Sequence, residues 1–265
     1  MTTKMRCFLL LAAMAPALLN AQVLRIVSYR CDPSGNNSLT FTNYPRTLYG
    51  GLLAARSADD DFWLPVAWNA LITNSTTTFQ FHTSPPKSFF RLVCSTNRLS
   101  LPSLPRFQVP SANITVDGNP SDWSGIQPAV TDRAGDAYGG PAGSDMTALY
   151  LARDSTKAYL RIDVTNAPPD GSLSFSVSFY TNYFPAYAGD RFVDISMHDL
   201  SCAVKQYTSS NCGGCWTNVA TGTLAVQGNV IEASVPLSAL NPPSPCYVRA
   251  YQEFDSTAIV EATFP

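Results

Sequence analysis

The chain has 265 residues, of which 45% are hydrophobic and 11% aromatic, so it is long and apolar enough to bury a substantial core. Only 14% of the residues are charged, and the formal net charge is −2. This balance excludes a disordered chain as the default and leaves no basic field for nucleic acid. We expect partners that are neutral and hydroxylated rather than ionic.

Residues 1–21 have the order of a cleavable secretory signal. Lys4 and Arg6 precede an apolar run from Phe8 to Leu19, which is followed by small and polar residues. This run is too short to span a bilayer, and no later run reaches eighteen uninterrupted apolar residues. We therefore expect an exported protein, secreted or held at the cell surface, that starts near Gln22 and has no transmembrane segment.

Six short runs rich in Val, Thr, Tyr, Phe and Trp lie between residues 22 and 95. They alternate in polarity or are fully apolar, and turn residues separate them, which predicts a small all-β sandwich. The runs are Leu24–Tyr29, Ser38–Thr42, Leu48–Ala55, Phe62–Trp68, Thr77–Phe81 and Phe89–Val93.

The order of the motifs in this region is distinctive. A Ser-Leu-Thr-Phe strand begins at Ser38, a Tyr-containing strand leads to an acidic turn, a Trp strand and a Thr-rich strand follow, and Pro-Pro-x-x-Phe-Phe-Arg-Leu closes the series at Leu92. This order resembles a small fibronectin type III-like module of large exported bacterial proteins. The resemblance implies a spacer or adhesion unit with no reaction attached.

Residues 96–112 change in composition and contain Pro102, Pro105 and Pro110. Proline removes backbone donors and favours extended chain, so we expect a semi-rigid linker and a domain boundary here.

The second domain is predicted over residues 113–265, with about nine strands in the proportions of a larger sandwich or jelly roll. A short helical turn is expected after Pro236, because Pro-Leu-Ser-Ala-Leu has proline at its first position and no strand alternation. The predicted strands are Thr147–Ala152, Ala158–Val164, Leu173–Tyr180, Arg191–Met197, Ala203–Tyr207, Thr223–Gln227, Val230–Val235, Tyr247–Phe254 and Ala258–Ala262.

A series of short motifs runs through this domain. Ile-x-Val-Asp-Gly, Asp-Trp, Thr-Asp-x-x-Gly-Asp, Leu-Tyr-Leu-Ala-x-Asp, Ala-Tyr-Leu-Arg-Ile-Asp and Ile-Glu-Ala-Ser-Val-Pro-Leu-Ser-Ala-Leu follow one another between Ile114 and Leu240. Together they resemble the family 9-like carbohydrate-binding modules and the related DOMON-type sandwiches over Ile114–Phe264. The resemblance implies a β-sandwich, a structural calcium ion, and a sugar or a b-type haem as ligand.

Three aspartates in the loop of residues 131–144 and at its end, Asp132, Asp136 and Asp145, are the predicted calcium ligands. Calcium prefers six to eight hard oxygens, and carboxylates with turn carbonyls supply them. Without a cation the converging carboxylates would repel one another. The alternative is that each aspartate only caps a turn.

Four aromatic residues are the predicted ligand-binding residues. Trp216 directly follows Cys215 in an expected rigid loop, and flat rings on rigid loops stack on the apolar face of a sugar. Tyr138, Tyr183 and Tyr187 lie in Gly- and Pro-containing loops and would form the other side. The alternative is that Trp216 covers disulfides, while Trp123 is expected in the core.

An even number of cysteines remains after removal of the leader, which indicates disulfides in an exported chain. Cys31 and Cys94 are expected to pair, and the other four allow three connectivities. A four-thiolate zinc site or a Cys212–Cys215 redox pair are the alternatives. The six predicted disulfide cysteines are Cys31, Cys94, Cys202, Cys212, Cys215 and Cys246.

The chain offers little for catalysis, and no enzyme is expected. His82 and His198 are its two histidines, and nothing in the sequence places a carboxylate pair such as Asp190 and Glu232 face to face. Possible axial haem ligands are Met146, Met197 and His198, but Met197 and His198 are neighbours and would point to opposite faces of a strand.

The sequence therefore predicts a secreted, non-catalytic carbohydrate-binding protein with a calcium-stabilised sandwich. A structural or adhesion protein of the cell surface, with protein contacts and no sugar site, is the second hypothesis. A b-type haem-binding protein is the third.

Overall fold

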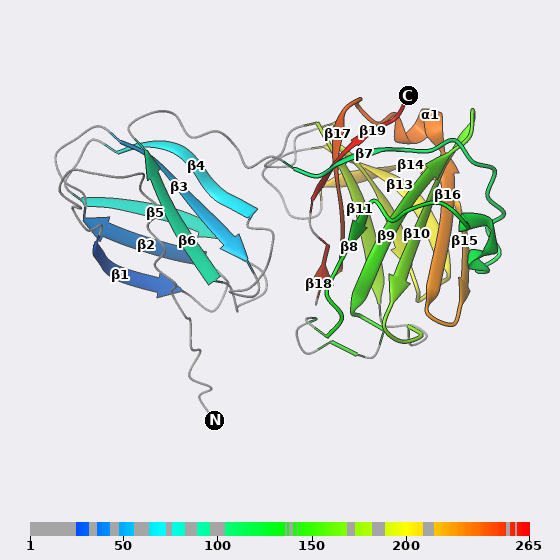
Figure 1. Cartoon of the computed structure of the whole chain (residues 1–265), viewed down its shortest axis with the longest axis horizontal. Helices are drawn as coiled ribbons and strands as arrows, with labels where there is room; N and C mark the ends of the chain where they lie inside the picture. The colour runs from blue at the N-terminus through cyan, green and yellow to red at the C-terminus, as the bar shows by residue number, and fades with distance from the viewer. Residues whose placement is uncertain are drawn as a thin grey trace. The chain divides into compact units, whose positions relative to one another are not determined.

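The structure is a computed structural model that describes residues 25–31, 36–42, 48–55, 64–72, 76–82, 89–95, 104–135, 137, 140–141, 143–168, 173–181, 189–208, 215–252, 255–257 and 259–265. The chain forms two compact units, Met1–Pro102 and Ser103–Pro265 (Figure 1). Both are built from β-strands, which confirms the predicted all-β class. In the described ranges no helix has the length and apolarity needed to cross a bilayer. The predicted leader, residues 1–21, lies outside these ranges.

Unit 1 consists of two three-stranded antiparallel sheets, and its six strands match the six predicted runs. Aromatic rings pack between the sheets: Tyr29 of one sheet lies 5.9 Å from Phe90 of the other, measured between ring centroids. In sheet order the strands are β1 (Arg25–Cys31), β2 (Asn36–Thr42) and β5 (Thr76–His82), then β4 (Leu64–Ile72), β3 (Leu48–Ala55) and β6 (Phe89–Ser95).

Unit 2 is a larger sandwich. Its five-stranded sheet runs in the order β15 (Thr223–Gln227), β16 (Val230–Pro236), β10 (Lys157–Val164), β9 (Met146–Arg153) and β8 (Val130–Thr131). The short helix α1 (Leu237–Leu240) follows β16, where a helical turn was predicted.

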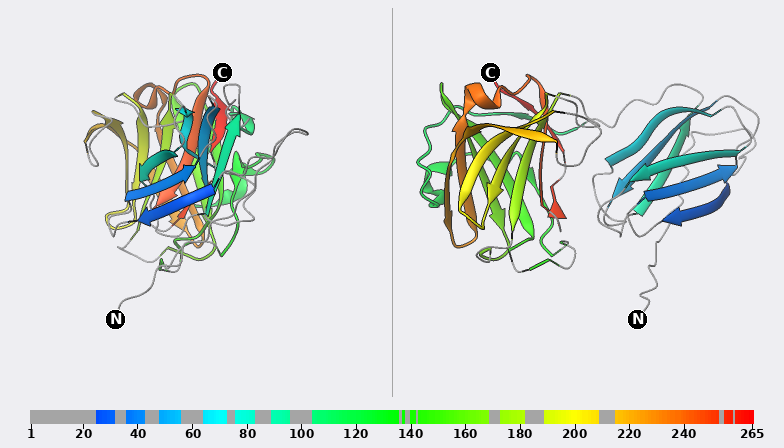
Figure 2. Two further views of the ribbon diagram at one scale, coloured as in Figure 1. Left: turned by 90° about the vertical axis from the view of Figure 1, so that its left-hand side faces the viewer. Right: turned by 180° about the vertical axis from the view of Figure 1, so that it is seen from behind.

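The second sheet of unit 2 has eight strands and is antiparallel except at one edge. The right-hand view of Figure 2 turns this sheet, with its yellow strands, towards the viewer. Its order is β14 (Trp216–Thr221), β13 (Ser201–Tyr207), β12 (Arg191–Ser196), β11 (Ser174–Tyr180), β17 (Cys246–Gln252), β19 (Val260–Thr263) and β7 (Arg106–Gln108), and β18 (Asp255–Ser256) pairs with β17.

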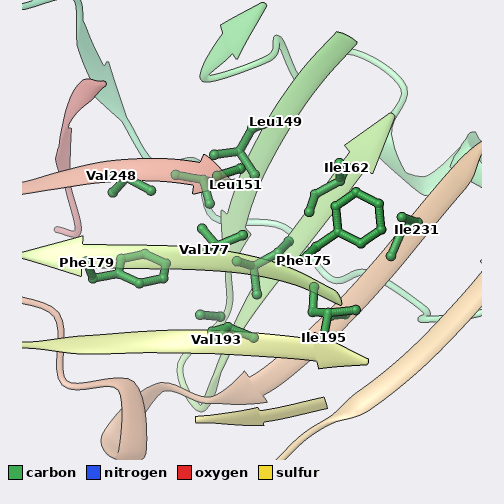
Figure 3. Packing of buried hydrophobic residues seen from close by; sticks show 14 of the residues in the cluster. Leu149, Leu151, Ile162, Phe175, Val177, Phe179, Val193, Ile195, Ile231 and Val248 are labelled. Carbon is green, nitrogen blue, oxygen red and sulfur yellow. The ribbon is translucent and has the colours of Figure 1, made fainter. Parts of the chain in front are cut away.

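The core of unit 2 lies between its two sheets. Figure 3 shows side chains of the two sheets pointing towards one another, with Leu149 and Ile162 from the five-stranded sheet and Phe175, Val177 and Val193 from the eight-stranded sheet. These side chains are essentially fully buried. Period-2 alternation therefore fixes which residues of the eight-stranded sheet face outwards.

The predicted linker extends too far towards the C-terminus. Arg106–Gln108 form β7, which pairs in parallel with β19, and Val109 is buried in the core of unit 2. Ser111 then bridges to Arg153. Because proline cannot donate to a strand ladder, this stretch pairs only at the edges of the sheets, but it is still part of unit 2.

The chain from Ile114 to Trp123 covers the outward face of the five-stranded sheet. Ile114 and Trp123 pack with Ala152 and Tyr159 in a second, smaller core, so the prediction that Trp123 is a core residue is confirmed. This segment includes a 3₁₀ turn, Pro120–Trp123, whose N-cap Asn119 accepts a hydrogen bond from Ser121 N.

A buried carboxylate fixes this covering segment. Glu232 of β16 has 0% exposure; its Oε2 accepts hydrogen bonds from Gly118 N at 2.9 Å and Asp117 N at 3.2 Å, and its Oε1 accepts one from Trp123 Nε1 at 2.8 Å. Burial raises the pKa of Glu232, and the three N–H donors oppose that shift. A Cβ on Gly118, whose φ is +83°, would lie 2.8 Å from Gln227 Cβ, so this turn requires glycine.

The hairpin between β9 and β10 is closed by Asp154, as its Asp-Ser-Thr-Lys sequence predicts. The carboxylate accepts hydrogen bonds from Thr156 N, Lys157 N and Tyr159 OH, at 2.6–2.7 Å. These donors hold the pKa of Asp154 well below its usual range, with the Tyr159 hydroxyl contributing most. Burial, and then the Asp154 carboxylate, raise the pKa of Tyr159 to about 12.

Candidate functional site

Aromatic side chains gather on the outward face of the eight-stranded sheet, the face that points away from the core. Trp216 at the start of β14 is directly opposite Tyr207 of β13 in the strand register. The Trp216 ring meets Phe192 edge-on, with centroids 6.0 Å apart, and Phe192 packs against Tyr207 at 4.9 Å. Although Phe192 is on the outward face, only 4% of it is exposed, whereas Trp216 is 43% exposed.

Two tyrosines reach across this face towards each other. Tyr207 lies on β13 and Tyr251 on β17, with two strands between them, so their backbones are roughly 14 Å apart across the sheet. Their hydroxyl oxygens nevertheless lie 3.3 Å apart. Both side chains must therefore extend over the sheet. We call Trp216, Phe192, Tyr207 and Tyr251 the aromatic row, and the meeting point of the two hydroxyls the tyrosine junction.

Ser178 of β11 lies beneath the tyrosine junction. Its register partners are Phe192 on one side and Arg249 on the other, and its side chain has 0% exposure. The hydroxyl makes no hydrogen bond of normal geometry, although it lies within reach of the Tyr180 and Tyr207 phenols. The two converging tyrosines thus account for the burial of Ser178 and Phe192 on an outward face.

The phenols of Tyr207 and Tyr180 remain protonated at neutral pH, because the pKa of each is raised. Burial raises the pKa of Tyr207, and the neighbouring Tyr251 adds to the shift. Burial also raises the pKa of Tyr180, which lies close enough to sense the charges of Arg249 and Asp190. Neutral phenols both donate and accept hydrogen bonds, which suits ligands that carry hydroxyl groups.

Charges at the Trp216 end of the row are paired. Lys205 Nζ lies 2.5 Å from Asp194 Oδ2 and 5.3 Å from the centroid of the Trp216 ring. The ammonium group therefore neutralises Asp194 and rests against the indole. This arrangement fixes the ring from one side and leaves little net charge beside it.

The placement of Trp216 differs from the predicted one, because this residue begins strand β14 instead of lying in a loop. A strand holds the ring more rigidly than a loop would, and it adds Phe192 and Tyr207 as neighbours. The other predicted ligand-binding residues, Tyr138, Tyr183 and Tyr187, lie outside the described residues. Tyr207 and Tyr251 were placed in strands by the sequence, without any signal that their rings would meet.

Two of the three predicted calcium ligands are described, and they lie at the same end of the β8–β9 pair. Asp132 N donates to Thr147 O, and Asp145 precedes β9. The Asp145 Oδ2 atom accepts hydrogen bonds from Gly135 N at 2.7 Å and Thr165 Oγ1 at 2.5 Å. Asp136 lies outside the described residues, and within them no group of three His, Cys, Asp or Glu is placed to hold a metal ion.

Two of the six cysteines depart from the prediction. Cys202 and Cys246 are free, buried thiols, so their predicted disulfides are wrong, and Cys215 is disulfide-bonded. Both free thiols belong to the core between the sheets. Burial raises the pKa of each to about 12. The side chains of Cys31, Cys94 and Cys212 lie outside the described part of the chain.

The register explains why the two free thiols do not pair. Cys202 is level with Phe175, near one end of β11, whereas Cys246 lies beyond Tyr180 at the other end of the same strand. About six residues of strand separate these levels, roughly 20 Å. A disulfide needs Cα atoms within about 7 Å of each other.

The carboxylates considered for catalysis are far from forming a pair. Glu232 is held by three N–H donors on the five-stranded sheet. Asp190 accepts hydrogen bonds from Thr181 N and Thr181 Oγ1 beside the other sheet. The residues considered for haem also diverge, because Met146 and Met197 are buried in the core while His198 is exposed.

No protein-family model matches the chain. No curated protein matches it either. Among solved structures, a family 9 carbohydrate-binding module from Caldicellulosiruptor kristjanssonii, in complex with cellotriose, is similar to this chain with a TM-score of 0.36 and 12% sequence identity. The alignment covers 60% of this chain and 94% of that chain. A likeness of this size does not bear on what this chain binds.

Proposed function

We propose that unit 2 binds a neutral glycan on the outward face of its eight-stranded sheet. The observation that carries the proposal is the half-exposed Trp216 ring at the end of the aromatic row, held edge-on by Phe192 and from one side by Lys205. A rigid, exposed ring next to neutral phenols offers both an apolar stacking face and hydrogen-bonding hydroxyls. Sugars require this combination.

The chemistry of the face favours binding over catalysis. The Lys205 ammonium is paired with Asp194, and Asp190 is bound by Thr181. The two aspartates that lie beside Phe192 on this face are therefore both held by protein groups, whereas hydrolysis of a glycosidic bond needs an acid and a base that face the substrate. The export predicted from residues 1–21 would bring this face to extracellular or surface glycans.

A glycan array probed with the chain lacking its predicted leader tests the proposal. We expect binding to neutral polysaccharides or oligosaccharides, and we expect the Trp216→Ala variant to lose most of the signal on the same array. An array without any wild-type signal would remove the proposal.

Protein adhesion is the second candidate, and it has its own supporting observation. β14 is an edge strand whose residues are almost all exposed, carry no charge and include Val219 at 40% exposure. Such an edge can accept an extended strand of a partner protein. An array without binding, together with protein partners that depend on Val219, would favour this second function.

We also propose that calcium stabilises the loop of residues 132–145 without touching the glycan. The position of Asp132 and Asp145 at one end of the β8–β9 pair supports this, and a carboxylate oxygen can accept further contacts beyond those Asp145 already makes. The described ligands alone do not complete a site, so Asp136 or backbone carbonyls would have to contribute.

Calcium at 100 times its dissociation constant should raise the melting temperature by roughly 5–10 °C over that in a chelator. Asp132→Asn should abolish this rise. Asp117→Asn, a change in a turn of the same unit, should keep it. Equal melting temperatures in calcium and chelator would contradict the proposal.

A further inference from the structure

The tyrosine junction brings together hydroxyls from three strands. Ser178 and Tyr180 come from β11, Tyr207 from β13 and Tyr251 from β17. The Tyr207 and Tyr251 oxygens are 3.3 Å apart, and the Ser178 hydroxyl lies buried below them. This convergence is unusual for an outward sheet face, where hydroxyls normally point into water.

The hydrogen-bonding capacity of these hydroxyls is not used up by the protein. Each hydroxyl can donate one hydrogen bond and accept two. Ser178 Oγ is fully buried and makes no hydrogen bond of normal geometry. A buried hydroxyl that has only poorly formed hydrogen bonds to its neighbours is costly, and a ligand hydroxyl that reaches the junction would relieve this cost.

The charges around the junction set the class of ligand. Arg249 and Asp190, which are opposite in charge, both lie close enough to act on Tyr180. Arg249 is the register partner of Ser178, and its Nε donates to Thr257 O at 3.3 Å. An acidic sugar would gain from Arg249 but be repelled by Asp190. A neutral sugar has no net charge to be repelled, and it can form hydrogen bonds with the hydroxyls of the junction.

We propose that the tyrosine junction is the polar anchor of the glycan site and takes one hydroxyl group of a neutral sugar ring while Trp216 stacks against the glycan. This inference rests on the proposed function, and it names residues that determine specificity. The rings of Tyr207 and Tyr251 provide apolar contact area for the sugar. Their hydroxyls and that of Ser178 provide directional hydrogen bonds. A ligand without a hydroxyl at the anchored position would lose these contacts.

Tyrosine-to-phenylalanine variants separate the hydroxyls from the rings. Tyr207→Phe and Tyr251→Phe should each weaken binding of the best array glycan by about three- to tenfold in titration calorimetry, as expected for one hydrogen bond. The double variant should lose less affinity than the product of the two single fold losses, because both hydroxyls act at one junction. Tyr150→Phe, on the outward face of the other sheet, is the matched control and should bind as the wild type does.

Ser178→Ala gives a readout that a purely structural role would not produce. Removing a buried hydroxyl that makes no well-formed hydrogen bond should leave the melting temperature of the free protein unchanged or higher, while glycan affinity falls. A loss of both affinity and stability would assign Ser178 a structural role and overturn its part in the anchor.

The outcomes distinguish this inference from the proposed function. If Trp216→Ala loses binding while both phenylalanine variants bind normally, the anchor is wrong and the function stands. Tighter binding of a uronic-acid oligosaccharide than of its neutral counterpart would overturn the neutral class. If the wild type binds no glycan, both proposals fall.

Discussion

Replacement of Glu232 by alanine is expected to lower the free energy of unfolding by about 3–5 kcal/mol. The carboxylate is fully buried and receives Gly118 N, Asp117 N and Trp123 Nε1. Its loss leaves these donors without an acceptor and detaches the segment that covers the five-stranded sheet. Urea unfolding followed by circular dichroism measures the change.

Two further variants test the reason for this effect. Glu232→Gln keeps the shape of the side chain but turns an N–H₂ group towards one of the N–H donors. Its free energy of unfolding should therefore lie between those of the wild type and Glu232→Ala. Trp123→Phe removes the indole donor. In that background Glu232→Gln should lower the free energy of unfolding by less than it does in the wild type. A Glu232→Ala variant with wild-type stability would show that the covering segment does not depend on this carboxylate.

Gly222→Ala should be the second most damaging change, at about 3 kcal/mol, the upper end of what overpacking costs. Gly222 joins β14 to β15, where the chain passes from one sheet to the other. A Cβ there would clash with Ser234 O and would lie 2.9 Å from Cys202 Sγ. The backbone oxygen belongs to β16 and cannot move without breaking the sheet.

Gly125→Ala is the control for this prediction. Its φ of +84° makes alanine unfavourable, but nothing lies within 4 Å of the added Cβ, so only the backbone cost of about 1 kcal/mol is expected. The same urea unfolding experiment compares the two. A Gly222→Ala variant no less stable than Gly125→Ala would contradict the close packing at this crossing.

Most of the strands could be predicted because their apolar residues alternate or run continuously. All six runs of unit 1 became strands, and the core of unit 2 follows the alternation of β11 and β12. β7 could not be predicted, because it has three residues between prolines and its partner β19 lies about 150 residues further along the chain. Short strands with distant partners leave no local pattern.

The site could be predicted only in part. Trp216 was predicted to stack on a ligand, but it was placed in a loop, because its strand β14 has almost no buried residues and therefore no alternation to detect. The tyrosine junction depends on a contact between Tyr207 and Tyr251 across two intervening strands, which no local sequence pattern encodes. The same holds for Glu232, whose three donors come from a segment more than a hundred residues earlier in the chain.

The free thiols show how a general rule failed on particular residues. An even number of cysteines in an expected secreted chain indicated full pairing, but Cys202 and Cys246 each occupy a core-facing position of a strand. There they act as small apolar side chains. Spacing in the sequence could not show that they lie at opposite ends of one sheet.

Titration calorimetry of the best array glycan into wild-type chain and Trp216→Ala tests glycan binding at the aromatic row most directly. Val219→Ala is the matched control, because it removes another exposed apolar side chain from the same strand. We expect Trp216→Ala to weaken glycan binding about tenfold or more, equivalent to about 1.4 kcal/mol, and Val219→Ala to stay within about twofold of the wild type. Equal affinity of the wild type and Trp216→Ala would contradict it.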